Sequence, residues 1–459
     1  MRYALLPIVL VFAIATFPVR AQQEQEVEQK TPTEKGPATV APAPATQPSS
    51  WLQWDTMTGD WNGARKELAN KGIEFGINVH QIIQDNAHGG AHTANGFRYS
   101  GSTDLTLILD TGKMGLWPGG QFLLNAEPKW GGYGVNPKVG SLIPVSLDGY
   151  KPGSDDGGII TLSEFFYQQV LFEGKLILIG GKLDGSRAFD LSEFADNERT
   201  QFMNLAFRNN PLIGKFLPYT TMGVGVIVNP LDWLSIRTAV ADTDGSATTT
   251  GFNTAFHGPT NTTVIHEWDF TIKPFGQVGH QRVGFAWSCE NFPYVSPVSP
   301  FKETGPLLYR LVGPKTFGKL SPLLPYQTAD DNIMVYYNFD QYLYTKADDP
   351  TQGIGLFGRF GWARNDVNPV EQYYSIGVGG KGLIPTRARD QYGVGYYVIG
   401  LSDTLRPILS QESGVEMYYN FEVTPWLHIS PDLQIIMMPG GNSHNDTAVV
   451  WGLRMQMNL

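Results

Sequence analysis

The stretch Val415-Glu416-Met417-Tyr418-Tyr419-Asn420-Phe421-Glu422 alternates between two kinds of side chain. Its odd-numbered positions hold valine, methionine, tyrosine and phenylalanine, whereas its even-numbered positions hold glutamate, tyrosine, asparagine and glutamate. A period of two residues is typical of a β-strand that has one apolar and one polar face. The stretch therefore predicts a strand between an apolar medium and a polar one.

The same alternation recurs along the chain, at 103–110, 234–241, 267–273 and 453–459. Beyond Trp51 there is no run of about 18 apolar residues, the length that a membrane-spanning helix requires. A closed sheet with lipid outside and water inside satisfies every backbone group and gives this pattern. We therefore predict an all-β fold, a transmembrane antiparallel β-barrel of about sixteen strands. The strands are expected near 73–83, 102–111, 119–127, 160–172, 174–182, 222–229, 231–241, 264–274, 279–288, 331–344, 352–363, 371–381, 391–400, 412–422, 424–437 and 447–459.

The connections and strand ends agree with a barrel. Longer loops are expected near 128–159, 183–221, 242–263 and 289–330. An aromatic girdle at the membrane interfaces is expected from tryptophans near strand ends, namely Trp233, Trp268, Trp426 and Trp451.

The N-terminal region divides into three parts. Residues 1–21 have a positive start and an apolar core, and they predict a secretory signal peptide cut near Ala21. Residues 22–50 are rich in Pro, Ala, Gln and Thr, which predicts a disordered linker. This linker is either a tail without a partner or a contact to the periplasm or peptidoglycan. Residues 51–459 then form the barrel, which is expected in the bacterial outer membrane and in contact with its lipid.

Composition excludes several classes of function. The net charge of -10 and the pI near 5.3 argue against a nucleic-acid partner. The single cysteine, Cys289, excludes an internal disulfide. The eight histidines are scattered without a metal-binding spacing, and Gly377–Gly382 matches GxGxxG but no helix follows it. We expect no cofactor, no metal and no enzymatic activity.

Three separated motifs resemble the carbohydrate-selective porins of the OprB type. The first is Thr58-Gly59-Asp60-Trp61-Asn62-Gly63-Ala64-Arg65, and the second runs from Phe194 to Asn204 after Gly181-Lys182-Leu183-Asp184. The third comprises Thr424-Pro425-Trp426-Leu427, Ser430-Pro431-Asp432-Leu433-Gln434 and Pro439-Gly440-Gly441. The resemblance covers about 51–459. It implies a sixteen-stranded outer-membrane barrel through which glucose and related mono- and small oligosaccharides diffuse. The sequence leaves open whether the porin is a monomer or a homotrimer.

Sugar hydroxyls are bound well by Arg as a donor, by Asp and Glu as acceptors, and by Asn as both. One candidate set follows the fifth predicted strand, where a long loop is expected to fold into the pore: Lys182, Asp184, Arg187, Arg199, Asn204 and Arg208. A second set lies on strands. Because an arginine facing lipid at mid-depth costs roughly 2–4 kcal/mol, these residues are expected to face the lumen: Arg237, Arg282, Arg359, Arg454, Glu164 and Glu416. Arg98, Glu127 and Trp130 are weaker candidates of the same kind.

Other functions stay open at this point. The same arginines would serve a general or anion-preferring diffusion porin. A barrel enzyme that uses paired lumen carboxylates and a structural tether of the cell envelope are more distant alternatives.

Overall fold

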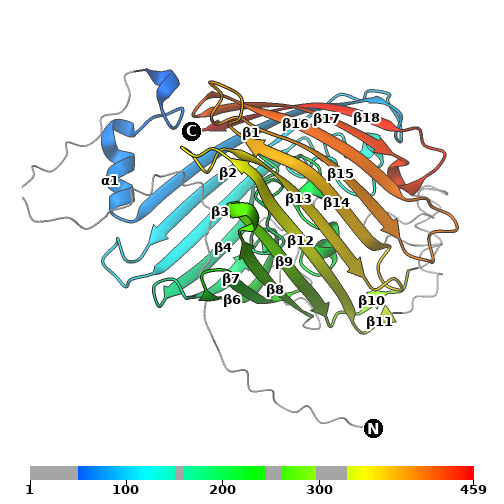
Figure 1. Ribbon diagram of the computed structural model, residues 1–459, viewed down its shortest axis with the longest axis horizontal. Helices are drawn as coiled ribbons and strands as arrows, with labels where there is room; N and C mark the ends of the chain where they lie inside the picture. The colour runs from blue at the N-terminus through cyan, green and yellow to red at the C-terminus, as the bar shows by residue number, and fades with distance from the viewer. Residues whose placement is uncertain (1–49, 150–159, 219, 244–260, 296–327) are drawn as a thin grey trace, which may run out of the picture.

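The computed structural model describes residues 50–149, 160–218, 220–243, 261–295 and 328–459. The predicted signal peptide and all of the predicted linker except Ser50 lie outside these residues. Within the described part of the chain, sixteen strands close into one barrel (Figure 1). They are β1 (Ile73–His88), β2 (Arg98–Asp110), β3 (Gly120–Trp130), β4 (Ile160–Leu171), β5 (Leu176–Leu183), β6 (Thr221–Leu231), β7 (Leu234–Asp242), β8 (Thr262–Ile272), β9 (Gly279–Ser288), β12 (Asn332–Thr345), β13 (Gly353–Ala363), β14 (Val370–Lys381), β15 (Gln391–Leu401), β16 (Glu412–Thr424), β17 (Leu427–Met437) and β18 (Ala448–Asn458).

Every strand pairs antiparallel with its neighbours in the chain, and β1 pairs with β18 to close the sheet. Each of the sixteen predicted strands is present, with ends that differ by a few residues, so the predicted fold class is confirmed. Two further short strands, β10 (Phe292–Pro293) and β11 (Thr328–Ala329), form a separate pair that the sequence pattern did not indicate.

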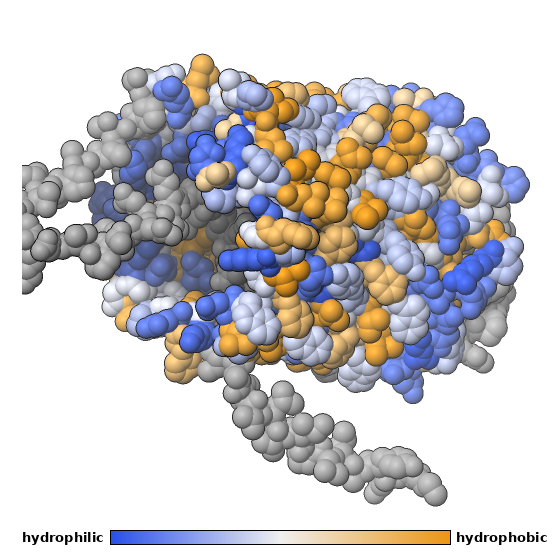
Figure 2. All heavy atoms as spheres, in the orientation of Figure 1, coloured by the Kyte–Doolittle hydropathy of each residue, from blue (hydrophilic) through white to orange (hydrophobic). Residues whose placement is uncertain are grey.

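Side chains alternate across the barrel wall as predicted. On β12, Ile333, Val335 and Tyr337 are exposed on the outer surface, whereas Met334 and Tyr336 are buried inside. Apolar residues gather over the strands of the face shown in Figure 2, and hydrophilic residues gather at its two ends. The outer surface thus matches a lipid environment in its middle and water at its rims.

The aromatic girdle is present in part. Trp233 and Trp451 are exposed on the outside, and Trp268 shares the outer face of β8. The prediction for Trp426 is wrong. This side chain is 5% exposed, because Trp51 packs against it with ring centroids 4.4 Å apart.

None of the helices in the described ranges is long and apolar enough to cross a membrane. The helical turns that lie between strands are short: α2 (Asn136–Val139), η3 (Gly185–Arg187), α3 (Leu205–Arg208), η4 (Pro211–Lys215), η5 (Pro274–Gly276) and η7 (Pro439–Gly441).

The two ends of the barrel differ in the length of their connections. Turns 172–175, 232–233 and 425–426 are short, whereas 131–159, 184–220 and 289–331 at the other end are long. Outer-membrane barrels have short periplasmic turns and long extracellular loops. We assign the ends accordingly.

The N-terminal motif lies at the periplasmic end of the closing seam. It contains η1 (Trp51–Gln53), η2 (Trp61–Gly63) and α1 (Ala64–Asn70). The backbone N–H of Met57 donates to Asn458 O (2.7 Å), and Arg65 Nη2 donates to Leu459 O (2.8 Å). The segment therefore ties the start of the barrel to its last strand.

Candidate functional site

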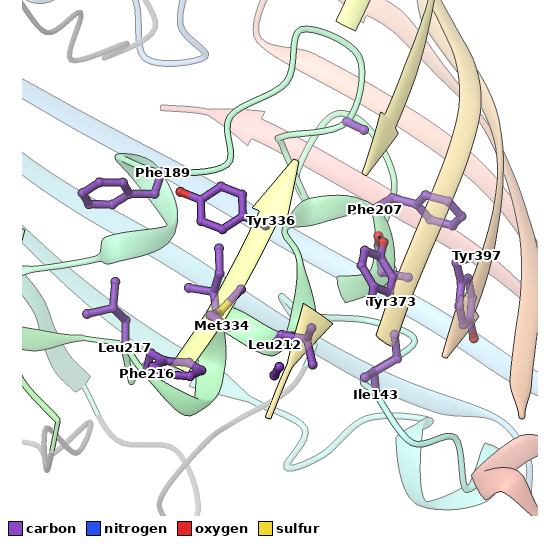
Figure 3. Packing of buried hydrophobic residues seen from close by; sticks show 14 of the residues in the cluster. Ile143, Phe189, Phe207, Leu212, Phe216, Leu217, Met334, Tyr336, Tyr373 and Tyr397 are labelled. Carbon is purple, nitrogen blue, oxygen red and sulfur yellow. Dashed lines mark hydrogen bonds between the residues drawn. The ribbon is translucent and has the colours of Figure 1, made fainter. Parts of the chain in front are cut away.

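The long connection after β5 folds into the barrel, as the sequence predicted. We call residues 184–217 the inner segment. Its apolar side chains pack against the inner wall of β8, β9 and β12–β16 in one cluster. Figure 3 shows Phe189, Phe207 and Leu212 of the inner segment beside Tyr336, Tyr373 and Tyr397 of the wall. The inner segment thereby fills one side of the barrel and narrows the lumen that remains.

Glycines of the wall accommodate the rings of the inner segment. A Cβ at Gly379 would lie 2.6 Å from Phe194 Cβ, and one at Gly393 would lie 2.8 Å from Phe202 Cζ. A Cβ at Gly395 would overlap the ring of Phe207. Only glycine permits such a close approach. The wall therefore has a shape complementary to this segment.

Polar side chains of the wall hold the backbone of the inner segment. Glu416 accepts hydrogen bonds from the N–H groups of Met203 (2.5 Å) and Asn204 (3.1 Å). Arg454 Nη1 donates to Glu198 O (2.7 Å). Arg359 donates to several carbonyls of the same segment and is 3% exposed. Three residues predicted to line the pore thus contact the backbone of the folded-in segment.

Arg237 and Arg282 belong to a network on the wall itself. Arg237 pairs with Glu267 (2.7 Å) and Asp269 (3.0 Å). Arg282 pairs with Asp269 (3.0 Å) and Asp340 (2.6 Å). Both arginines face inward, as their alternation predicted.

A cluster of charged residues of both signs lies where the inner segment faces β2, β3 and β4. Its acidic members on these strands are buried, and Arg187 and Arg199 are partly exposed. Arg199 Nη2 lies 2.8 Å from Asp104 and 3.7 Å from Glu127. Arg187, whose side chain is 41% exposed, lies 3.4 Å from Glu164 and 3.5 Å from Asp184. Lys129 adds a third cation, 3.2 Å from Glu127 and 3.9 Å from Asp148. We call these residues the charged strip: Asp104, Glu127, Lys129, Asp148, Glu164, Asp184, Arg187 and Arg199.

Two carboxyl groups beside Arg208 differ in their ionisation. Arg208 donates to Glu198 through Nε (2.5 Å) and to Asp196 through Nη1 (2.6 Å). Burial raises the pKa of Asp196 to about 7 against the charge of Arg208. Burial also acts upward on the pKa of Glu198, but Arg208 and Arg199 outweigh it and hold that pKa well below its ordinary value. Glu198 is therefore ionised at neutral pH and joins the two arginines.

Arg187 lies on the inner segment, and the negative charge of Glu164 on β4 raises the pKa of its guanidinium. Asn204 caps α3 by accepting the N–H of Ala206 (2.9 Å), and Asp184 caps η3 by accepting the N–H of Ser186 (2.9 Å). These short-range bonds fix the start of each helical turn. They also orient the arginines that follow.

Three candidates lie away from the charged strip. Lys182 is fully buried, donates from Nζ to Leu162 O (2.5 Å), and shares a strand face with the exposed Leu178. Trp130 lies over Gly101, on the strand face opposite to Lys129. Arg98 is bonded through Nη1 to the carbonyls of Asn95 and Phe97 at the extracellular rim.

Sequence reasoning missed several charged residues of this interior. Asp104 was recognised only as a polar position of a strand, and Lys129, Asp148 and Asp190 were not singled out. The inward positions of Asp104 on β2 and Lys129 on β3 follow from the alternation, but their pairing with the inner segment does not. Asp148 and Asp190 lie in connections between strands, where no alternation places them. Within the described residues, no group of three or more His, Cys, Asp or Glu is arranged to hold a metal ion.

Residues 94–459 match the family model described as "Carbohydrate-selective porin, OprB family". The chain belongs to the OprB family. It is a carbohydrate-selective porin of the outer membrane. The resemblance seen in the sequence is thus confirmed, and the OprB family and fold indicate a channel rather than an enzyme.

Individual relatives agree with the OprB assignment over nearly the whole length. "Porin B" of Pseudomonas aeruginosa is 23% identical over 90% of this chain and 92% of its own. "Putative porin QuiX" of Acinetobacter baylyi is 22% identical over 89% of this chain and 93% of its own. The solved "High pH structure of Pseudomonas putida OprB" covers 89% of this chain and 99% of that one, with a TM-score of 0.74 and 23% identity. That structure supports the fold.

Proposed function

We propose that neutral mono- and small oligosaccharides cross this porin between the inner segment and the wall of β2–β4, in weak contact with the charged strip. The observation that supports this path is the pairing of Arg187 and Arg199 with carboxylates. A paired arginine and carboxylate present hydrogen-bond donors and acceptors side by side, and adjacent sugar hydroxyls require both.

An apolar patch lies next to the charged strip on the same wall. Ile108, Leu123 and Phe166 form a small buried cluster on β2, β3 and β4. Ile108 lies four residues beyond Asp104, and Phe166 lies two beyond Glu164. A sugar ring has an apolar face as well as hydroxyls, so the two kinds of surface suit its two kinds of contact.

The other predicted residues have a different role in this proposal. Arg359, Arg454 and Glu416 hold the inner segment, and Arg237 and Arg282 brace the wall. Of the predicted candidates, only those that belong to the charged strip are assigned to the sugar path: Asp184, Arg187, Arg199, Glu164 and the weaker candidate Glu127. Asp104, Asp148 and Lys129 complete the strip.

The charge of the strip argues against the anion-preferring alternative. It contains five carboxylates and three cations, and each cation is paired. Such a filter has no excess positive charge with which to concentrate anions. We expect the reversal potential of the purified porin in a KCl gradient to show no preference for chloride. A clear chloride preference would favour the anion-porin alternative.

A further inference from the structure

Asp190 connects the inner segment to three strands of the wall. Its side chain is fully buried, and its backbone adopts the left-handed conformation (φ 59°), which is uncommon outside glycine. Its N–H donates to Glu267 Oε2 on β8 (2.8 Å). Asn338 Nδ2 on β12 donates to its Oδ1 (2.8 Å) and to its O (3.0 Å). A strained residue with this many partners is held in place by its surroundings.

Arg359 on β13 completes these contacts. Its Nε lies 2.9 Å from Asp190 Oδ2, and the two side chains are 1% and 0% exposed. The same guanidinium donates to the carbonyls of Ala195 (2.6 Å) and Phe207 (2.9 Å). A planar group with five donors is suited to joining separate stretches of backbone.

These contacts fix the parts of the inner segment that hold the arginines of the charged strip. Asp190 lies three residues after Arg187, and Ala195 and Phe207 lie on either side of Arg199 in the sequence. The Asp190–Arg359 pair itself does not touch the charged strip, because its bonds go to the wall and to the backbone of the inner segment.

We propose that Asp190 and Arg359 are positioning residues for sugar selectivity. They set the distance between the inner segment and β2–β4 and thereby the geometry of Arg187 and Arg199. The proposal rests on the sugar path described above. A shift of about 1 Å in a binding group is enough to lower recognition strongly.

Two variants test it from opposite sides of the contact. Asp190→Asn keeps the shape of the side chain but replaces one oxygen by an NH₂ group. Because both oxygens of Asp190 accept hydrogen bonds, this NH₂ group would face a donor and lose a contact. Asn338→Ala removes the donor to Asp190 Oδ1, while Asp190 keeps its pairing with Arg359. It also removes the acceptor of a 3.3 Å hydrogen bond from Arg282, whose ion pairs with Asp269 and Asp340 remain. Each protein is measured in planar bilayers for single-channel conductance and for the glucose concentration that halves the ion current.

Asp269→Asn is the matched control. Asp269 is also a buried acid of an arginine network, with Arg237, Arg282 and His280 of the wall as its partners. Loss of stability alone would affect all three variants, whereas loss of positioning affects only the first two. Folding is monitored by the heat-dependent mobility of the barrel on SDS gels.

We expect Asp190→Asn and Asn338→Ala to weaken glucose block by about tenfold or more and to change conductance, while Asp269→Asn leaves both as in the wild type. Wild-type block and conductance in either folded variant would overturn the proposal. Failure of both variants to fold while Asp269→Asn folds would also overturn it, because the two residues would then serve the fold. Absence of glucose block in the wild type would instead contradict the proposed sugar path. In that case a change in conductance in Asp190→Asn and Asn338→Ala, but not in Asp269→Asn, would still support their role in positioning the inner segment.

Discussion

Replacing Gly395 with valine should open the channel, with a higher single-channel conductance and a weaker block of ion current by glucose. Any Cβ at Gly395 overlaps the ring of Phe207, which lies fully buried against Phe202 (centroids 4.6 Å apart) and Tyr397 (5.8 Å). Forcing extra atoms into such packing costs about 1–3 kcal/mol. The barrel wall is tied by two neighbouring strands at every point, so we expect the inner segment to move and the wall to stay.

Gly225→Val is the control for this experiment. Gly225 also lies on the inner wall, on β6, but a Cβ there meets nothing nearer than Thr238 O at 3.6 Å. Bilayer recordings of both variants separate the effect of the Phe207 contact from that of a larger residue in a strand. Unchanged conductance and glucose block in Gly395→Val would show that the packing of Phe207 does not determine the width of the path.

Replacing Arg199 with alanine should strongly lower the apparent affinity of the channel for glucose. Arg199 contacts Asp104 and Glu127 and is 18% exposed, so it borders the open side of the strip. A hydrogen bond to a charged group contributes about 1.5–3 kcal/mol. This corresponds to a loss of about 10- to 100-fold in affinity.

The measurement is the concentration of glucose that halves the ion current, for Arg199→Ala, Arg199→Lys and Arg98→Ala. Lysine keeps the charge but lacks the planar fork, so Arg199→Lys is expected to lie between alanine and the wild type. Arg98 is a half-buried arginine bonded to the carbonyls of Asn95 and Phe97 and does not belong to the charged strip, so Arg98→Ala should behave as the wild type. Equal effects of the two alanine variants would place the sugar contact elsewhere.

The strands could be predicted from sequence because each residue of a barrel strand has one of only two environments. Successive side chains of a strand point in turn to the lipid and to the lumen, so the alternation at 415–422 is enough to predict a barrel strand. Trp426 shows the limit of this argument. A tryptophan at a strand end is expected to meet lipid headgroups. Here Trp51, which is 375 residues away in the sequence, covers it, and no local sequence pattern predicts such a contact.

The candidate site could be predicted less completely, because a lumen-facing residue meets either water or a folded-in loop. Arg359 and Arg454 face inward as predicted, yet both bond to the backbone of the inner segment. Arg187 and Arg199, which were predicted in the long connection and not on strands, lie on the charged strip instead. The phenylalanines at 189, 194, 202, 207 and 216 were a usable signal, since so many rings in a connection indicate a packed segment.

The central claim is tested most directly by uptake into liposomes that contain the purified porin, comparing glucose with a neutral amino acid of similar size. A sugar-selective path along the charged strip predicts that glucose enters much faster than the amino acid. Entry of both solutes at rates set by size alone would contradict it and indicate a general diffusion porin.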